Sequence, residues 1–193
     1  GRPRGMVTLP SGETIVSDIE RHDIRIFDPD TGALEPLAGQ PGCKGFSSGT
    51  GGEARFDRPY GMVALANGDV LVADMMNHRI RRVKRDGSVD DFAGDGFPDM
   101  IDGPKATARF NMPKDLAIDA AGNVYVSDTG NHRIRRISAA GVVQTIAGDG
   151  TMGFEDGAGN KARFYGQEGL DVTANGKTLY VADGTSGEID PVP

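Results

Sequence analysis

Short apolar segments of strand length recur along the whole chain, separated by turn residues. A clear series runs over residues 115–118, 123–127, 133–137 and 142–147, where Val, Ile and Leu alternate with polar side chains. Segments of four to six such residues, bounded by Gly, Asn or Asp, are typical of β-strands, and none has the length of a helix. The first turn of each series ends in glycine, as in Asn67-Gly68 and Ala121-Gly122, which suits a tight hairpin. The pattern predicts sheets of four antiparallel strands joined by hairpins.

The same series is repeated along the sequence. Ala54-Arg55-Phe56 returns as Ala108-Arg109-Phe110 and as Ala162-Arg163-Phe164, 54 residues apart each time. One repeat position holds all the histidines of the chain: His22, His78 and His132. A single four-stranded sheet leaves a face uncovered, and stacking such sheets around an axis covers both faces. The predicted fold is therefore an all-β propeller over residues 1–193, with blades at about 1–59, 60–113, 114–167 and a partial 168–193.

Two segments resemble a known repeat family. Residues 68–80 (GDVLVADMMNHRI) and 122–134 (GNVYVSDTGNHRI) closely resemble the NHL repeat. The first repeat keeps His22 and Ile24 but lacks the Asn and Arg that flank the histidine, and the fourth departs over residues 184–189. The resemblance covers essentially the whole chain and implies a propeller. It also implies functions known on such propellers: partner binding, metal-dependent lyase or hydrolase activity, and RNA binding through a basic face.

The number of repeats is too small for a closed ring, because propellers have four or more blades. The chain starts Gly-Arg-Pro-Arg, without a methionine or an apolar signal segment, and we expect a fragment or a processed product. The favoured interpretation is a longer natural chain with about six blades. The alternative is a homodimer that pairs through the unfinished blade edges.

Charge and composition argue against some classes of partner, above all nucleic acid. The net charge is −7, whereas nucleic-acid binders are usually basic, so RNA binding is the minor alternative. The basic residues of 79–85 and 133–136 are also divided between two faces by strand alternation. No apolar run approaches the length of a membrane span, and the single Cys43 excludes an internal disulfide.

Strand order places many loops at one end of the blades. The turns that end at the repeat histidines lie at the same end as the long links 40–53, 95–107 and 149–157, and we name these turns and links the loop rim. Binding residues concentrate on loops carried by a rigid scaffold. We therefore expect a non-catalytic module that binds a protein, peptide or glycan. The candidate partner-binding residues are His78, Arg79, His132, Arg133, Phe154 and Asp156.

Metal binding is a second hypothesis for the loop rim. Three imidazoles around an axis could hold zinc, which makes His22, His78 and His132 candidate ligands. The Asp- and Gly-rich loops 95–103 and 149–157 could hold calcium, although neither has EF-hand spacing. Recurrence of the histidine in each repeat favours a local structural role, so no cofactor is expected. Within the same turns, Asp74 with Arg79 and Asp128 with Arg133 are expected to form ion pairs.

An enzyme is the alternative to a binding module. A metal-dependent lyase or a lactonase-type hydrolase would need unrepeated polar residues at the mouth of the central channel. The candidates on or near the first strands of the third and fourth repeats are Lys114, Asp115, Glu168 and Asp171. Gln167 is also unusual, because proline occupies its place in the preceding repeats. No residue is assigned a catalytic role.

Overall fold

The computed structural model describes residues 1–184 and 189–192. Within these residues every extended element is a β-strand, and the helical elements are short 3₁₀ turns. The prediction of an all-β chain built from antiparallel propeller blades is confirmed. The chain forms two compact units, residues 1–92 and 93–193, which we describe separately. Part of the departure of the fourth repeat, residues 185–188, lies outside the described residues.

Unit 1 contains two sheets. The first consists of β1 (Pro3–Thr8), β2 (Thr14–Asp18), β3 (Asp23–Phe27) and β4 (Leu34–Ala38) in sequential order. The second consists of β6 (Pro59–Ala64), β7 (Val70–Asp74), β8 (Arg79–Val83) and β9 (Ser88–Ala93), with the short β5 (Gly49–Thr50) added at the edge of β9. The link between the two sheets thus supplies a fifth strand that the sequence pattern did not predict.

Unit 2 also contains two sheets. Its first sheet consists of β11 (Pro113–Ile118), β12 (Val124–Asp128), β13 (Arg133–Ile137) and β14 (Val142–Ala147), with the short β10 (Gly103–Pro104) beside β14. The next sheet consists of β15 (Gln167–Val172), β16 (Leu179–Asp183) and β17 (Ile189–Val192).

Short 3₁₀ turns occur in both units. They are η1 (Gly51–Glu53) and η2 (Met75–Asn77) in unit 1, and η3 (Thr129–Asn131) and η4 (Gly159–Lys161) in unit 2.

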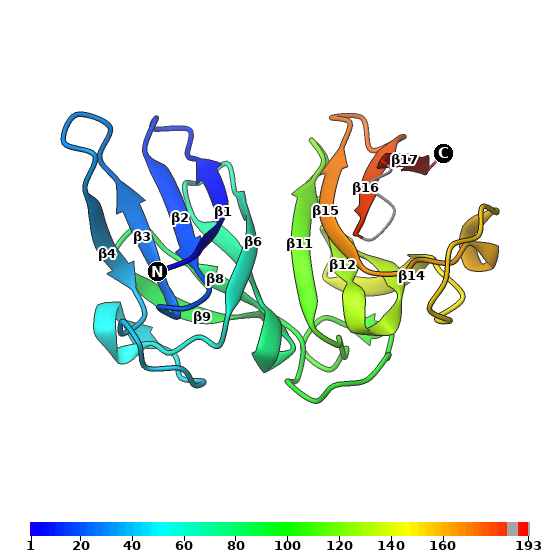
Figure 1. The fold of residues 1–193 in the computed structure, drawn as a ribbon, viewed down its shortest axis with the longest axis horizontal. Helices are drawn as coiled ribbons and strands as arrows, with labels where there is room; N and C mark the ends of the chain where they lie inside the picture. The colour runs from blue at the N-terminus through cyan, green and yellow to red at the C-terminus, as the bar shows by residue number, and fades with distance from the viewer. Residues whose placement is uncertain (185–188, 193) are drawn as a thin grey trace. The chain divides into compact units, whose positions relative to one another are not determined.

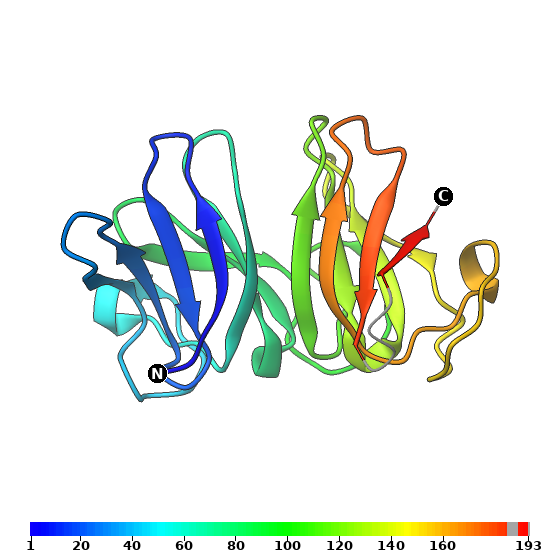
Figure 2. The same ribbon diagram turned by 45° about the horizontal axis from the view of Figure 1, so that its top comes forward.

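The hairpins follow the predicted turn chemistry. Gly68 and Gly122 have φ of 87° and 81°, values that glycine adopts without steric cost. Within each unit these hairpins lie at one end of the sheets, and the links that lead to the next sheet leave from the opposite end (Figures 1 and 2). The loop rim predicted from strand order is therefore a real end of each blade.

Apolar side chains between neighbouring sheets form the core of each unit. In unit 1, where β1 lies beside β6, Ile15 and Ile24 pack in one cluster with Phe56, Met62 and Val72. Fully burying each such side chain stabilises the fold by about 1.5–3 kcal/mol. The blades are thus held together by their faces, which leaves the loops at the rim free to vary.

In unit 2, where β11 lies beside β15, Tyr125 and Ile134 pack with Phe164, Leu179 and Val181. The apolar members of this cluster come from both sheets, so the two blades share one core.

Candidate functional site

The repeat histidines occupy a strained position at the loop rim. His22, His78 and His132 have φ of 58°, 54° and 52°, the left-handed region that non-glycine residues seldom adopt. His78 and His132 each end a 3₁₀ turn, η2 and η3. The histidine therefore closes the turn between the second and third strands in each of the first three repeats, which is a structural role.

The ring of the first histidine holds the next blade. The Nδ1 atom of His22 accepts the backbone N–H of Arg58 at 3.0 Å, and the same nitrogen lies 3.5 Å from Asp57. His78 is half-buried, and burial lowers its pKa. Among the described residues no group of three His, Cys, Asp or Glu side chains is arranged to hold a metal ion. The zinc and calcium hypotheses stay predictions.

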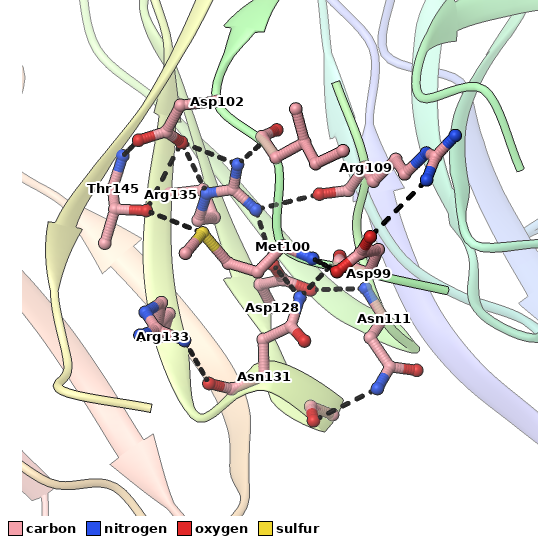
Figure 3. A network of polar contacts seen from close by, with 12 residues as sticks. Asp99, Met100, Asp102, Arg109, Asn111, Asp128, Asn131, Arg133, Arg135 and Thr145 are labelled. Atoms are coloured by element: carbon pink, nitrogen blue, oxygen red, sulfur yellow. Dashed lines mark hydrogen bonds and ion pairs between the residues drawn. The ribbon is translucent and has the colours of Figure 1, made fainter. Parts of the chain in front are cut away.

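A buried ion pair fastens the loop rim of unit 2 to its blade (Figure 3). Asp128 at the end of β12 and Arg135 on β13 are both fully buried, and their closest atoms are 2.7 Å apart. Arg135 also donates to the carbonyl oxygens of Ile101 and Arg109, both at 2.9 Å, and to Asp102 at 2.6 Å. One guanidinium thus joins the strand both to the incoming link, at residues 101 and 102, and to residue 109 just after it.

Unit 1 contains the equivalent buried arginine–aspartate pair, with a second carboxylate from a different place in the fold. Arg81 is fully buried, lies 3.3 Å from Asp74 and donates to the carbonyl oxygens of Ser47 and Arg55. Its second carboxylate is Asp91 at 2.8 Å, on β9, whereas Arg135 takes its second carboxylate from the link. The predicted pairs of Asp74 with Arg79 and of Asp128 with Arg133 were therefore wrong. The buried carboxylate pairs with the arginine two residues further along the third strand.

Burial makes both carboxyl groups less acidic. It raises the pKa of Asp74 to about 7 and that of Asp128 to about 6. Arginine, amide and backbone N–H donors oppose this shift, among them Arg135 and Asn131 on Asp128. Each carboxyl also accepts a backbone N–H from the residues that follow the link, that of Asp57 in unit 1 and that of Asn111 in unit 2. These groups are fully used in holding the link and are closed to a ligand.

The sequence-predicted rim arginines are also engaged. In unit 1, Arg79 stacks on the ring of Phe46, with 4.2 Å to the ring centre, and pairs with Asp91 at 2.9 Å. In unit 2, Arg133 donates to the carbonyl oxygen of Asp149 at 2.9 Å. Both arginines stabilise loops next to the histidines His78 and His132. These two arginines therefore support the rim loops and contribute less to the outer surface of the rim.

The remaining predicted residues, Phe154 and Asp156, lie in the exposed link 149–157 of unit 2. Phe154 is 52% exposed and shares the rim of this unit with Phe97, which is 63% exposed. Ile101 and Met152 are further exposed apolar side chains on the same links. Phe97, Ile101 and Met152 are not among the residues predicted from the sequence. Their signal was an apolar side chain inside an otherwise Gly- and Asp-rich link.

Polar residues also meet on the inner strands of unit 2. Lys114 on β11 pairs with Glu168 on β15 at 2.8 Å. Asp115 accepts the backbone N–H of Leu170 at 2.8 Å. Burial raises the pKa of Asp115 to about 6, and the negative charge of Asp171 adds to this effect. The candidate residues for the enzyme hypothesis are thus brought together, as an ion pair beside a half-buried carboxyl group.

The third and fourth repeats differ from the others at this point. The positions of Asp115 in the other repeats are Gly5, Gly61 and Gly169. At Gly5 a Cβ atom would come within 2.4 Å of the carbonyl oxygen of Tyr60. Gln167, which replaces proline, is fully buried. Asp115 is therefore a local departure from a position where close packing favours glycine.

The basic cluster of the second repeat does not form a free cationic face. Arg81 is fully buried, and Arg82 binds Asp90 through two hydrogen bonds of 3.0 and 2.7 Å. Lys84 also reaches Asp90, and Arg85 pairs with Glu13 at 2.7 Å. Because these charges are already matched by acids, the geometry gives no support to the RNA alternative. Among the described residues no helix is long and apolar enough to cross a membrane.

Similarity to known proteins agrees with the repeat pattern. The NHL repeat family model matches residues 110–137. The chain is 32% identical over 148 residues to the chloroplastic protein SUPPRESSOR OF QUENCHING 1 of Arabidopsis thaliana, which covers 70% of this chain and 14% of that protein. It is 37% identical over 93 residues to human NHL repeat-containing protein 2, which covers 48% of this chain and 13% of that protein. The chain thus spans a small part of these relatives.

Solved structures show the same fold at lower identity. A structural genomics protein of unknown function from Bacteroides thetaiotaomicron has a TM-score of 0.81 and 19% identity, over 99% of this chain and 47% of that chain. A gluconolactonase from Xanthomonas campestris has a TM-score of 0.64 and 17% identity, over 98% of this chain and 61% of that chain. At such identities these structures support the fold and leave the activity open. The family match and the relatives named for this repeat show NHL repeats in the chain, and the four antiparallel sheets and the solved structures show the fold of β-propeller blades.

Proposed function

We propose that this NHL-repeat chain is a binding module whose loop rim in unit 2 engages a protein or peptide. The observation that carries the proposal is the exposure of apolar side chains on both rim links of this unit: Phe97 and Ile101 on one, Met152 and Phe154 on the other. Aromatic residues and methionine are enriched where proteins bind each other, and anchors of this kind supply much of the binding energy. The presence of Met152 and Ile101 favours a peptide or protein over a glycan, since flexible thioether and aliphatic groups offer a sugar no stacking face.

The frame beneath these side chains supports the same proposal. Arg109 lies under Phe97, 5.3 Å from the ring centre, and is held by Asp95 and Asp99. Arg163 is held by Asp149 and Glu155 in the link that carries Phe154. Loops fixed by ion pairs and by the buried Arg135 lose little conformational freedom on binding. Such preorganisation favours affinity.

The test is selection from a random-peptide phage library against the immobilised chain. Peptides that bind should lose at least about tenfold in affinity to Phe97→Ser or Phe154→Ser, because anchors at an interface cost more than 1 kcal/mol when removed. Val142→Ser is the matched control, an exposed apolar residue at the hairpin end of the same unit. Peptides that bind both rim variants as well as the unmodified chain would contradict the proposal. Binding to a glycan array without any selected peptide would replace it with the glycan alternative.

A second candidate, the hydrolase, rests on one specific observation. Asp115 has a pKa raised to about 6, and carboxyl groups with raised pKa are common among catalytic acids and bases. The neighbouring Lys114–Glu168 pair would then orient a polar substrate. We rank this candidate second because the hydroxyl group beside Asp115, that of Ser127, is fully buried, and the described residues contain no group of three metal ligands.

A further inference from the structure

The corresponding rim links of the two units differ in charge. The link 40–53 of unit 1 contains one lysine and one glutamate and has no net charge. The link 95–107 of unit 2 contains Asp95, Asp99 and Asp102 against one lysine, which gives a net charge of −2. The two links occupy the same place in the repeat, so each aspartate can be compared with the residue that unit 1 has in its place.

The first aspartate replaces a neutral residue that makes the same contact. In unit 1 the amide oxygen of Gln40 accepts a hydrogen bond from the guanidinium of Arg55. In unit 2 Asp95 accepts the corresponding hydrogen bond from Arg109 at 2.8 Å. The contact is therefore made with or without a negative charge on the link, and the local fold does not require the charge of Asp95.

The third aspartate also has a neutral counterpart. The hydroxyl oxygen of Ser48 accepts a hydrogen bond from Arg81 at 3.3 Å. In unit 2 Asp102 accepts one from Arg135 at 2.6 Å (Figure 3). Unit 1 supplies the second carboxylate of its arginine from β9, where Asp91 lies 2.8 Å from Arg81. The acid can thus lie on the strand, but in unit 2 it lies on the link, with its side chain 44% exposed.

Asp99 contributes least to the structure of the link. Its counterpart is Gly45, since each of the two residues donates its N–H to the carbonyl oxygen of the phenylalanine eleven residues further along. The side chain of Asp99 is 53% exposed and lies 3.4 Å from Arg109, which Asp95 already neutralises at 2.8 Å. Asp99 therefore adds negative charge to a surface where the arginine is already paired.

Exposed apolar side chains lie on the same link as these charges. Phe97 and Ile101 are both exposed, one on each side of Asp99 in the sequence. The link is held on the third blade, because β10 pairs with β14 and Arg135 binds the carbonyl oxygen of Ile101. This surface thus combines apolar contact area with excess negative charge. A partner that complements both has apolar side chains together with positive charge.

We propose that the partner of the unit 2 rim is a basic segment of a protein. Its lysine or arginine side chains face Asp99 and Asp102, and an apolar side chain packs on Phe97 and Ile101. This inference rests on the proposed function and adds the class of partner. Opposite charges speed association and exclude acidic partners, whereas a neutral or acidic partner would leave the excess charge of the link unmatched.

Fluorescence anisotropy with two labelled peptides tests the proposal. One peptide alternates lysine with phenylalanine and serine, and the other has glutamate in place of every lysine. The lysine peptide should bind the unmodified chain at least about tenfold more tightly, because like charges across an interface are strongly unfavourable. Added salt should reduce this difference, since ions screen exposed charges. Asp99→Asn should weaken the lysine peptide about two- to fivefold, the effect of one exposed ion pair, without weakening the glutamate peptide.

Asp86→Asn is the matched control. Asp86 is an exposed aspartate in the hairpin between β8 and β9, outside the loop rim, and the same change there should alter neither affinity. Equal losses in Asp99→Asn and Asp86→Asn would mean that the lysine peptide is attracted to the net charge of −7 of the whole chain, and would overturn the proposal. Circular dichroism melting curves show whether both variants fold.

Phe97→Ser separates a failure of this proposal from a failure of the proposed function. If it weakens both peptides and the lysine peptide has no advantage, the rim binds peptides without a preference for basic ones. Peptides selected from the random library that bind the rim but are not enriched in lysine and arginine would lead to the same conclusion. If no selected or synthetic peptide loses affinity to Phe97→Ser or Phe154→Ser, the binding function of the rim is itself contradicted, and the class of partner with it.

Discussion

Replacing Arg135 by methionine is expected to lower the free energy of unfolding by about 3–5 kcal/mol, because removing one partner of a buried ion pair leaves the other charge uncompensated. Asp128 would keep only the N–H donors of Asn111 and Asn131. The link would lose its contacts through Ile101, Asp102 and Arg109. Urea unfolding followed by circular dichroism at pH 8 measures the loss. The loss should be smaller at pH 5, where an unpaired Asp128 takes up a proton.

Two further variants isolate the buried pair. Arg163→Met removes an arginine that also bridges acids on a link, but its ion pairs are exposed, so it should change stability little. Adding Asp128→Asn to Arg135→Met should recover part of the loss, because no charge is then left buried without a partner. Equal effects of Arg135→Met and Arg163→Met would show that the pair is not what fastens the link to the blade.

The strands and the repeat were predictable because both are local properties of the sequence. Alternation of apolar and polar residues gave strands at 124–128 and 133–137, and glycines such as Gly122 marked the turns. The fifth strands β5 and β10 were not predictable in this way. They pair Gly49 with Val89 and Gly103 with Val143, contacts far apart in sequence that depend on how the link crosses the next blade.

The arginine that pairs with the buried Asp128 could not be predicted from the turn sequence alone. Asp128 and Arg133 do face each other in the register of β12 and β13. The carboxylate points inward, however, because it accepts the backbone N–H of Asn111, which follows the link. Residues two apart on a strand share a face, and Arg135 therefore reaches the buried side where Asp128 lies. Which arginine is buried depends on the link, and the link has no regular pattern to read.

The candidate partner surface was predictable as a region and only partly as residues. Strand order alone placed the histidine turns and the links at one end. The outer surface of that end in unit 2 is nevertheless formed by Phe97 and Met152 together with the predicted Phe154, while the predicted Arg133 lies in the frame beneath. A repeated residue is used to build each blade. The exposed side chains Phe97 and Met152, which we propose for partner binding, lie on links whose sequences vary between repeats.

Asp115→Asn is expected to stabilise the chain at pH 7 by as much as about 3 kcal/mol and to leave it almost unchanged at pH 4. The pKa of Asp115 is raised to about 6 in the folded chain, against an ordinary value of 3.8. Between these two values the folded state binds more protons than the unfolded state, so the contribution of this group falls as pH rises. A shift of about two units corresponds to about 3 kcal/mol. Asparagine keeps an oxygen that can accept the N–H of Leu170 but cannot ionise.

Urea unfolding of the unmodified chain and of Asp115→Asn between pH 4 and pH 8 measures the contribution of Asp115 alone, since every other titrating residue is common to the two chains. The difference in free energy of unfolding between Asp115→Asn and the unmodified chain should increase from pH 4 to pH 7 and stay constant above pH 7. A difference independent of pH would mean that Asp115 ionises normally, in spite of its burial beside Asp171. If the predicted gain appears, the third blade holds a carboxyl group that weakens the fold at a position occupied by glycine in the other repeats. Stability given up at one unrepeated inner-strand residue is most simply explained by a function of that residue.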